Sequence, residues 1–485
     1  MTPINFKLIN LLNSLSHNEI KEFKKFISSP VYFGGRNYIP VLEHLLKNKT
    51  KGFENIYARD IYEKLYPGKK FSRQTLKNRF SELYKLGEEF LVYLNLKYNK
   101  PEKEKIILSM LIDRKIHGPF ESKYKKLRNQ LLSEKYNDKK LFDFSYINEL
   151  HLEYLNSKKN IGNILDHYYE KSQLNFCMYL INMFQAGFEF SLQEYDNKTY
   201  DSNFVYLYLK DLDLDEQMKA MNKSNYLVYR ITAMYYYLFK AFVNPENEEF
   251  YFLSHKIFTQ LSAELDDKYK INIFNLLTYF CMRKQNEGNK KFRVELFELY
   301  KEKLSQGLFS DLQNPIYLFN NFRDYVFIGL ALKKYKWVED FIYNYSRELP
   351  ADIREDEMKL SYAKLYIAHS QYEKSLINLE NIKTTNYLLY LDSSTLKLCS
   401  YYQLERYEDA FLELDKLKHY IRNHNEIPLV HKQPTMNFLK IYQKLLNIIL
   451  QPEKNDIGYL EKEIHTFNQL SKKDWILEKI SELKD

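Results

Sequence analysis

One short phrase occurs three times between Tyr325 and Ile421, and it constrains the fold more than any other feature. An aromatic residue followed within two positions by glutamate stands at Trp337, Tyr372 and Tyr407, and both intervals are 35 residues long. An amphipathic run precedes each aromatic and a second run follows it. A fixed period of this length, with an aromatic at the bend, is typical of stacked helix–turn–helix repeats. The sequence therefore predicts a helical repeat array in this part of the chain.

Composition predicts helices along the whole chain. The 485 residues include only 12 Gly and 12 Pro, well below the usual shares of about 7% and 5%. Both residues interrupt helices. Segments with strand-like alternation are absent between the apolar-periodic runs, so we expect an all-α protein.

Three widely separated cysteines, Cys177, Cys281 and Cys399, lie within apolar helical patterns. This sparse, odd set indicates buried thiols in a reducing compartment rather than a disulfide framework. The N-terminus lacks the pattern of a signal peptide, and no stretch approaches the roughly 18 apolar residues that a membrane span requires. We expect a cytoplasmic protein with no membrane partner.

Charge is distributed unevenly. Residues 1–140 contain 29 Lys and Arg against 15 Asp and Glu, whereas residues 141–485 contain 43 basic and 49 acidic residues. A basic N-terminal segment indicates an acidic partner or a polyanion, although lysine-rich solvated helices also produce such a balance.

The first hundred residues have the layout of a helix-turn-helix or winged-helix-like module. Ser16 and Glu19 have the capping-box form. A short helix over 58–65 is stopped by Tyr66-Pro67-Gly68, and Ser72 is a suitable N-cap for a long helix that ends near Leu96. The pattern breaks near Asn99, where we place a boundary.

The start of this long helix is a candidate nucleic-acid interface. Its polar face carries amides that pair with adenine edges and cations that bind phosphates; the candidates are Lys69, Lys70, Arg73, Gln74, Lys77, Asn78, Ser81 and Lys85. Glu82 and Glu89 lie on the same side and are expected to repel phosphate. The alternative is a solvated helix face or a protein contact.

The remaining chain is divided as follows: an irregular region of helical hairpins over 101–320, repeats over 321–425, and capping helices over 426–485. Pro428 and Pro434 are expected to mark a connector before the capping helices. A repeat stack needs such helices because its last unit would otherwise expose an apolar face.

The three units resemble tetratricopeptide repeats, which implies a right-handed α-solenoid. The second unit has small residues and an aromatic at the expected places, the third has Leu398 in place of a small residue, and the first has Asp340 where a small residue is expected; the matching residues are Ala363, Tyr366, Ser375, Tyr401 and Ala410. The whole chain also resembles a class of helical proteins common in Bacteroidota, with matching segments at 61–68 and 165–169. This second resemblance implies a fold and no activity.

The tetratricopeptide resemblance further implies that the first helix of each unit lines a concave groove. The residues that it would present are Tyr325, Leu332, Leu360, Lys364, Ile367, Cys399 and Tyr402. An apolar, aromatic groove with one cation suits an extended peptide or a partner helix. The alternative is that these aromatics pack against neighbouring helices. The basic residues that hold a C-terminal carboxylate in some members of the family are replaced by Leu360 and Thr395.

Catalytic motifs are absent from the sequence. It contains no dinucleotide or phosphate-binding glycine motif, no nucleophile elbow and no zinc-protease motif. The histidines are scattered, and we expect no metal and no cofactor. The sequence thus favours a non-enzymatic scaffold that binds a protein or peptide, with a nucleic-acid-binding regulator as the alternative.

Overall fold

The computed structural model describes residues 6–32, 36–47, 58–158, 164–195, 204–309, 315–382, 386–451, 457–467 and 469–484. Within these ranges the regular elements are the α-helices α1 to α24 and short 3₁₀ turns, and no β-strand is present. The all-α prediction is therefore confirmed for the described residues. The chain divides into two compact units, Met1–Tyr179 and Leu180–Asp485.

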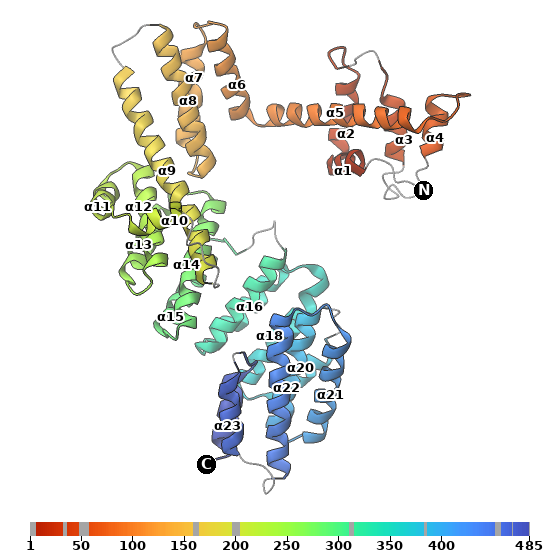
Figure 1. Ribbon diagram of the computed structural model, residues 1–485, viewed down its shortest axis with the longest axis vertical. Coiled ribbons are helices and arrows are strands. Elements are labelled where there is room, and N and C mark those ends of the chain that lie inside the picture. The colour runs from red at the N-terminus through yellow and green to blue at the C-terminus, as the bar shows by residue number, and fades with distance from the viewer. Residues whose placement is uncertain are drawn as a thin grey trace. The chain divides into compact units, whose positions relative to one another are not determined.

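Within the described residues, the first unit contains eight complete helices and the beginning of a ninth, which Figure 1 labels. Their bounds are α1 (Phe6–Ser14), α2 (His17–Ile27), α3 (Ile39–Lys47), α4 (Ala58–Leu65), α5 (Arg73–Tyr98), α6 (Lys100–Asp113), α7 (Phe120–Ser133), α8 (Asp138–Ser157) and α9 (Ile164–Tyr195). Helix α9 continues into the second unit.

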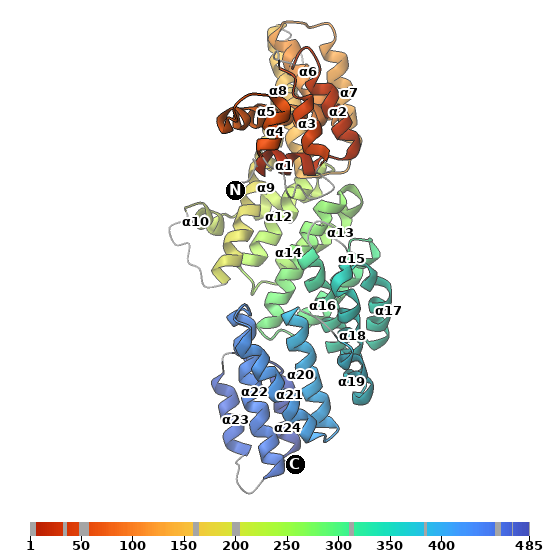
Figure 2. The same ribbon diagram turned by 90° about the vertical axis from the view of Figure 1, so that its right-hand side faces the viewer.

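The second unit continues with helices α10 to α24, and those from α12 to α23 pack in successive pairs (Figure 2). Their bounds are α10 (Phe204–Asp211), α11 (Asp215–Lys223), α12 (Leu227–Val243), α13 (Glu249–Leu261), α14 (Asp267–Asn286), α15 (Lys291–Ser305), α16 (Pro315–Ala331), α17 (Tyr335–Tyr345), α18 (Ala351–Ala368), α19 (Tyr372–Glu380), α20 (Tyr387–Gln403), α21 (Tyr407–Asn423), α22 (Leu429–Leu450), α23 (Ile457–Thr466) and α24 (Lys473–Glu482).

Local signals place the helix starts of the first unit correctly. The Ser16 hydroxyl accepts the Glu19 N–H, and the Glu19 carboxylate accepts the Ser16 N–H, so the predicted capping box is present. Ser72 caps α5 by accepting the Thr75 N–H. Asn99 ends α5 and caps α6, which is the break that the sequence predicts.

The core around α5 comes from residues 8–94. Helices α1, α2 and α4 pack against α5, which buries the predicted stripe of Leu76, Phe80, Leu83, Phe90 and Leu94. A fully buried leucine or phenylalanine side chain contributes about 1.5–3 kcal/mol. This apolar stripe therefore decides which face of α5 points outward.

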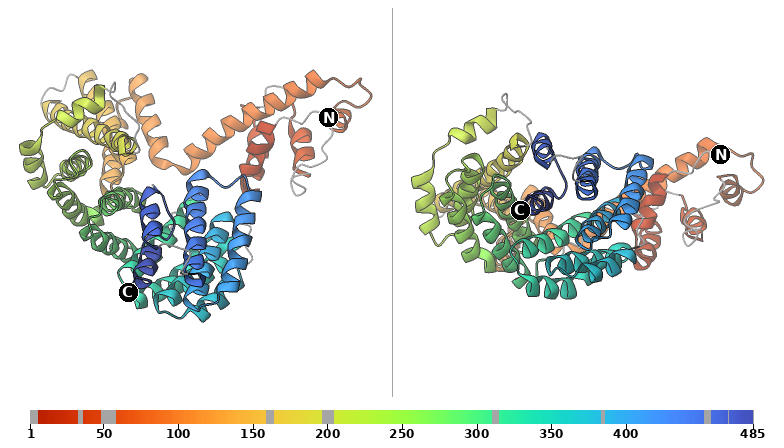
Figure 3. Two further views of the ribbon diagram at one scale, coloured as in Figure 1. Left: turned by 60° about the horizontal axis from the view of Figure 1, so that its bottom comes forward. Right: turned by 90° about the horizontal axis from the view of Figure 1, so that it is seen from below.

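Three successive hairpins, α16/α17, α18/α19 and α20/α21, share one turn geometry (Figure 3, teal to blue). The turn residues Lys333, Ser370 and Glu405 have φ of 57°, 56° and 55°. In each hairpin, the backbone N–H of the residue after this turn residue donates a hydrogen bond to the carbonyl five residues earlier, which ends the first helix. The donor–acceptor pairs are Lys334–Gly329, Gln371–Tyr366 and Arg406–Tyr401, at 2.8, 2.8 and 2.9 Å.

This shared turn corrects the alignment of the first repeat. The second helices α17, α19 and α21 begin at Tyr335, Tyr372 and Tyr407, so Tyr335 rather than Trp337 is equivalent to the two later tyrosines. The first interval is 37 residues and only the second is 35. Trp337 instead packs edge-on against Phe297 of α15, with the ring centroids 4.8 Å apart.

The corrected alignment also changes the assignment of the small residue in the first unit. Asp340 is exposed, and Val338 holds the place of Ser375 and Ala410. Val338 is accommodated because Gly329 stands opposite, where a Cβ would lie 2.4 Å from its Cγ2. In the later hairpins the equivalent positions hold Tyr366 with Ser375 and Tyr401 with Ala410.

The C-terminal helices differ from the prediction at Pro434, which lies inside α22 rather than in a connector. Proline lacks the N–H that would bond to the carbonyl of Val430, and apolar burial of the helix offsets this loss. Helix α24 returns to α20, where Trp475 packs edge-on against Tyr402 at 5.2 Å between ring centroids.

Candidate functional site

The structure divides the predicted groove residues into buried and partly exposed groups. Tyr325 and Leu360 are core residues, with Tyr325 stacked on Tyr300 at 3.9 Å between ring centroids. Cys399 and Tyr402 are also buried, because helices from the C-terminal end pack over them. These four side chains cannot present a surface to a ligand, and their assignment to a groove is wrong.

The partly exposed groove candidates are Leu332, Lys364 and Ile367. Ile367 packs against the cluster around Leu360. Lys364 is the only one of the three that is charged, and it belongs to a set of ionic groups on the first helices of the hairpins. We call the surface of α16, α18 and α20 that carries these groups the first-helix face.

A buried ion pair anchors the first-helix face. Arg323 of α16 donates from Nε and Nη2 to Oε2 of Glu357 on α18, at 2.9 and 2.8 Å. The Glu357 side chain is 0% exposed and that of Arg323 is 16% exposed. A second carboxylate, Asp392 of α20, lies 3.1 Å from Arg323 Nη1 and 3.7 Å from Lys364 Nζ. Four charges from three consecutive hairpins thus converge.

Burial and charge act differently on the two carboxylates of this cluster. Burial raises the pKa of Glu357, and Arg323 and Lys364 offset only part of that effect. The surrounding protein would also raise the pKa of Asp392, but Lys364, Arg323 and Lys472 hold that pKa below its ordinary value. The Asp392 side chain is 44% exposed. It is therefore an accessible anion held in place by fixed cations.

Lys364 within the cluster and the neighbouring Asp324 also have shifted pKa values. Burial lowers the pKa of Lys364, against the opposing effect of Asp392 and Glu357. Burial raises the pKa of Asp324 to about 6. Perturbed groups of this kind gather at binding sites, although structural ion-pair networks also produce them.

Sequence reasoning missed Arg323, Glu357 and Asp392. A signal was present, because Glu357 and Asp392 are carboxylates 35 residues apart, each within an apolar helical run. A charge that recurs in the repeat period inside a core pattern indicates a buried partner of opposite sign.

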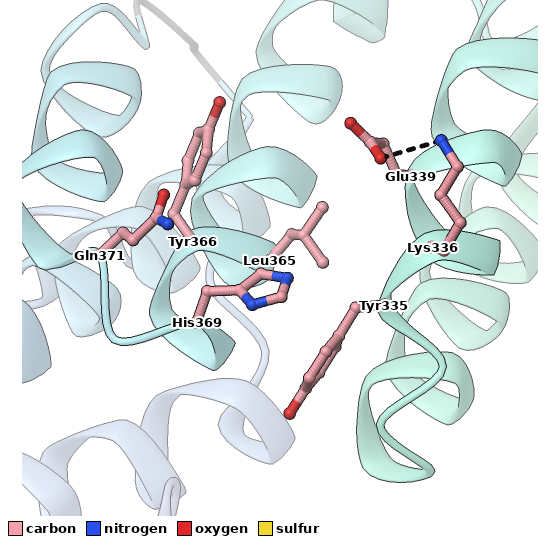
Figure 4. Close-up of a pocket in the computed structure, with 7 residues that line it drawn as sticks. All are labelled: Tyr335, Lys336, Glu339, Leu365, Tyr366, His369 and Gln371. Carbon is pink, nitrogen blue, oxygen red and sulfur yellow. Dashed lines mark hydrogen bonds and ion pairs between the residues drawn. The ribbon is translucent and has the colours of Figure 1, made fainter.

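A pocket of about 390 Å³ opens between the first and second hairpins (Figure 4). Its walls are Tyr335, Lys336 and Glu339 from the start of α17, Leu365, Tyr366 and His369 from the end of α18, and Gln371 from the following turn. The rings of Tyr335 and His369 are 4.5 Å apart. Lys336 Nζ lies 3.3 Å from Glu339 and 3.1 Å from Asp340.

The predicted nucleic-acid candidates lie on the outward face at the start of α5. Ser81 is half-buried, and the other seven are exposed: Lys69, Lys70, Arg73, Gln74, Lys77, Asn78 and Lys85. The amide of Gln74 donates to Asn78 Oδ1 at 2.8 Å, so the two candidate base-reading side chains are paired with each other.

The structure corrects the expectation that Glu82 repels phosphate. Its carboxylate is held by Arg36 at 2.6 Å, Arg79 at 3.1 Å and the Tyr38 hydroxyl at 2.8 Å. Burial alone would raise the pKa of Glu82, but hydrogen bonds from Tyr38 and Arg36 keep it below its ordinary value. Two arginines thus compensate this charge. Glu89 remains exposed on α5.

Two of the cysteine thiols are poorly suited to nucleophilic chemistry. Burial raises the pKa of Cys281, and that of Cys399 to about 12, which disfavours the nucleophilic thiolate. Among the described residues, no group of three or more His, Cys, Asp or Glu side chains is placed to hold a metal ion. In the same ranges, no helix is long and apolar enough to cross a bilayer.

Comparisons with protein-family models, with curated proteins and with solved structures returned no match. The functional interpretation therefore depends on the first-helix face, the pocket and the basic end of α5.

Proposed function

We propose that the chain is a non-enzymatic scaffold that binds a partner protein through the first-helix face of a tetratricopeptide-like solenoid. The observation that carries this proposal is Asp392, an accessible carboxylate fixed by Arg323 and beside Lys364. Repeat arrays use continuous surfaces of this kind to hold extended partners. The recognition is polar at this point, because four of the six uncharged residues expected in the groove are buried; they are Tyr325, Leu360, Cys399 and Tyr402.

Reversing the charge of Asp392 is expected to abolish partner capture. A lysine at this position would lie beside Lys364 and Arg323, and it would repel a hydrogen-bond donor of the partner that binds the Asp392 carboxylate. Removing one charge of a desolvated pair in an interface weakens the binding free energy by roughly 2–5 kcal/mol. The measurement is affinity capture from the source lysate with the full chain, Asp392→Lys, and Glu408→Lys as control. Glu408 is an exposed acid on the second helix α21. Equal capture of the same partner by Asp392→Lys and wild type would contradict the proposal.

A second candidate function is nucleic-acid binding by a helix-turn-helix-like module in the first unit, with the solenoid used for dimerisation or regulation. The specific observation in its favour is the compensation of Glu82 by Arg36 and Arg79. Because the charge of Glu82 is compensated, it reduces the attraction of the exposed cations around the start of α5 for phosphate less than the sequence indicates. Lysine and arginine at a helix start bind phosphates without sequence preference and set the salt dependence.

The variant Lys70→Glu, Arg73→Glu, Lys77→Glu is expected to bind a 20-base-pair DNA duplex much more weakly than the wild-type chain. Each lost phosphate contact reduces the slope of log affinity against log salt by about 0.9. Fluorescence anisotropy with the full chain at several salt concentrations measures both quantities. The control carries the same charge change at the exposed residues Lys126, Lys135 and Lys139. Equal weakening in both variants, or no binding at low salt, would exclude this interface.

A further inference from the structure

The junction that holds the pocket, between the first two hairpins, has an equivalent junction between the second and third hairpins. Because the turns are equivalent, Tyr366 corresponds to Tyr401 and Gln371 corresponds to Arg406. At the second junction the Arg406 guanidinium lies over the Tyr401 ring, 5.2 Å from its centroid. It also pairs with Asp409 at 2.7 Å and lies 3.8 Å from Glu373 of the preceding hairpin. The chain itself therefore shows what occupies this kind of junction.

The first junction lacks that guanidinium. Gln371 is shorter and uncharged, and Lys336 stands where the second junction has Glu373. Lys336 turns to its own helix, pairing with Glu339 and Asp340 rather than crossing the junction. At the first junction the pocket opens beside Tyr366 and Gln371, the residues equivalent to Tyr401 and Arg406 (Figure 4).

The open pocket keeps the chemistry that attracts a cation. Tyr335, Tyr366 and His369 contribute aromatic faces, and the Lys374 ammonium already lies 5.9 Å from the Tyr366 centroid. The carboxylate of Glu339 is on the wall, and its side chain is 53% exposed. Aromatic rings beside a carboxylate are a typical receptor for guanidinium or ammonium groups.

Two lysines oppose such a ligand: Lys374, over the Tyr366 ring, and Lys336 on the pocket wall, whose side chain is 78% exposed. Exposed ion pairs within one helix contribute only a few tenths of a kcal/mol. An incoming guanidinium can therefore displace the Lys336 ammonium into solvent and take over Glu339, with stacking on Tyr366 as the additional gain.

We propose that this pocket receives an arginine side chain of the partner protein, which supplies in trans the guanidinium that Arg406 supplies within the chain. The inference deepens the proposed partner binding and depends on it for its biological meaning. The size of the pocket, about 390 Å³, is within the range of ligand sites of roughly 300–1,000 Å³.

The test uses N-acetyl-L-argininamide as the probe and does not need the partner. Titration calorimetry of the full chain is expected to give a dissociation constant of roughly 1–10 mM, as for one cation over an aromatic ring with one ion pair. The neutral, nearly isosteric N-acetyl-L-citrullinamide is expected to bind about tenfold more weakly or not at all. Crystals soaked with the arginine probe should show its guanidinium within about 6 Å of the Tyr366 centroid.

Two variants assign the binding to this pocket. Lys336→Glu removes the competing cation and is expected to tighten the arginine probe severalfold. Lys336→Glu with Gln371→Arg recreates the pair Glu373–Arg406 and is expected to abolish probe binding, because the chain then fills its own pocket. The control is Lys301→Glu, which makes the same charge change at a lysine of α15 that, like Lys336, is paired with a glutamate of its own helix, in this case Glu298.

Equal affinity for the two probes, weaker binding by Lys336→Glu, or unchanged binding by the double variant would each overturn the proposal. A failure of the Asp392→Lys experiment with intact probe binding would remove the proposed partner site but leave the arginine pocket. The opposite result would leave partner binding and remove the arginine assignment.

Discussion

Replacing Arg323 with methionine is expected to lower the free energy of unfolding of the second unit by about 3–5 kcal/mol, because it leaves the fully buried Glu357 without its cation. The methionine retains much of the apolar volume of the arginine stem. The decrease in the free energy of unfolding is therefore caused by the missing charge and not by a cavity. Asp392 would also lose its nearest cation, at 3.1 Å.

The measurement is urea unfolding followed by tryptophan fluorescence. Both tryptophans of the chain, Trp337 and Trp475, are in the second unit, so the signal reports that unit. The matched control is Arg323→Met with Glu357→Gln, which removes both charges and is expected to recover a large part of the loss. If the single and double variants are equally unstable, the ion pair does not explain the effect.

The Arg323→Met variant should also acquire a pH dependence. Burial raises the pKa of Glu357 above the ordinary value of 4.5 even with Arg323 present, and without the guanidinium this pKa rises further. A carboxyl whose folded pKa is raised binds its proton more tightly in the folded state, so stability falls as pH rises above the unfolded value. The destabilisation is therefore expected to be smaller near pH 5 than near pH 8.

The second large effect is expected at His255 of α13, where raising the pH through about 9 should destabilise the second unit. His255 lies between two carboxylates of α15, with Nδ1 3.2 Å from Glu295 and Nε2 2.9 Å from Glu302. Burial would lower the pKa of His255, but Glu295 and Glu302 outweigh burial and raise the pKa to about 9. The Tyr251 hydroxyl donates to Glu295 at 3.0 Å and holds that carboxylate in place.

The sign of the His255 effect follows from its raised pKa. The contribution to stability is complete below the unfolded value of 6.5 and is lost as the pH rises through about 9. A shift of this size corresponds to roughly 3 kcal/mol. Urea unfolding at pH 6 and pH 10 measures this loss of stability. The His255→Gln variant separates the contribution of His255 from the others, because wild type and variant share every other titrating group. An identical difference between the two pH values in wild type and His255→Gln would show that His255 is not responsible.

Helix starts were predictable because their signals are local. A hydroxyl and a carboxylate three residues apart, as in Ser16 and Glu19, satisfy the free amides of the same turn. Ser72 acts in the same way on Thr75. The scarcity of glycine and proline likewise acts residue by residue, so the all-helical prediction needed no tertiary contact.

The candidate sites were predictable only in part, because exposure depends on segments distant in the chain. The outward face of α5 follows from its apolar stripe, but the neutralisation of Glu82 depends on Arg36, which is 46 positions away. The position of Tyr402 in α20 predicts a groove residue, but Trp475 of α24 packs over it. The alignment of Trp337 with the later tyrosines was an error for a related reason, since the turn geometry at Lys333 fixes the repeat register.

The amino-acid sequence alone determined the helices, their caps and the polar face of α5, because these depend on interactions within one or two turns. The tertiary structure decided that Arg323, Glu357 and Asp392 meet and that Trp475 of α24 covers Tyr402. It also decided that a pocket opens beside Gln371, whereas the equivalent Arg406 lies over the ring of Tyr401. The physical reason is that burial and charge pairing depend on which helices pack together, and no local pattern specifies that.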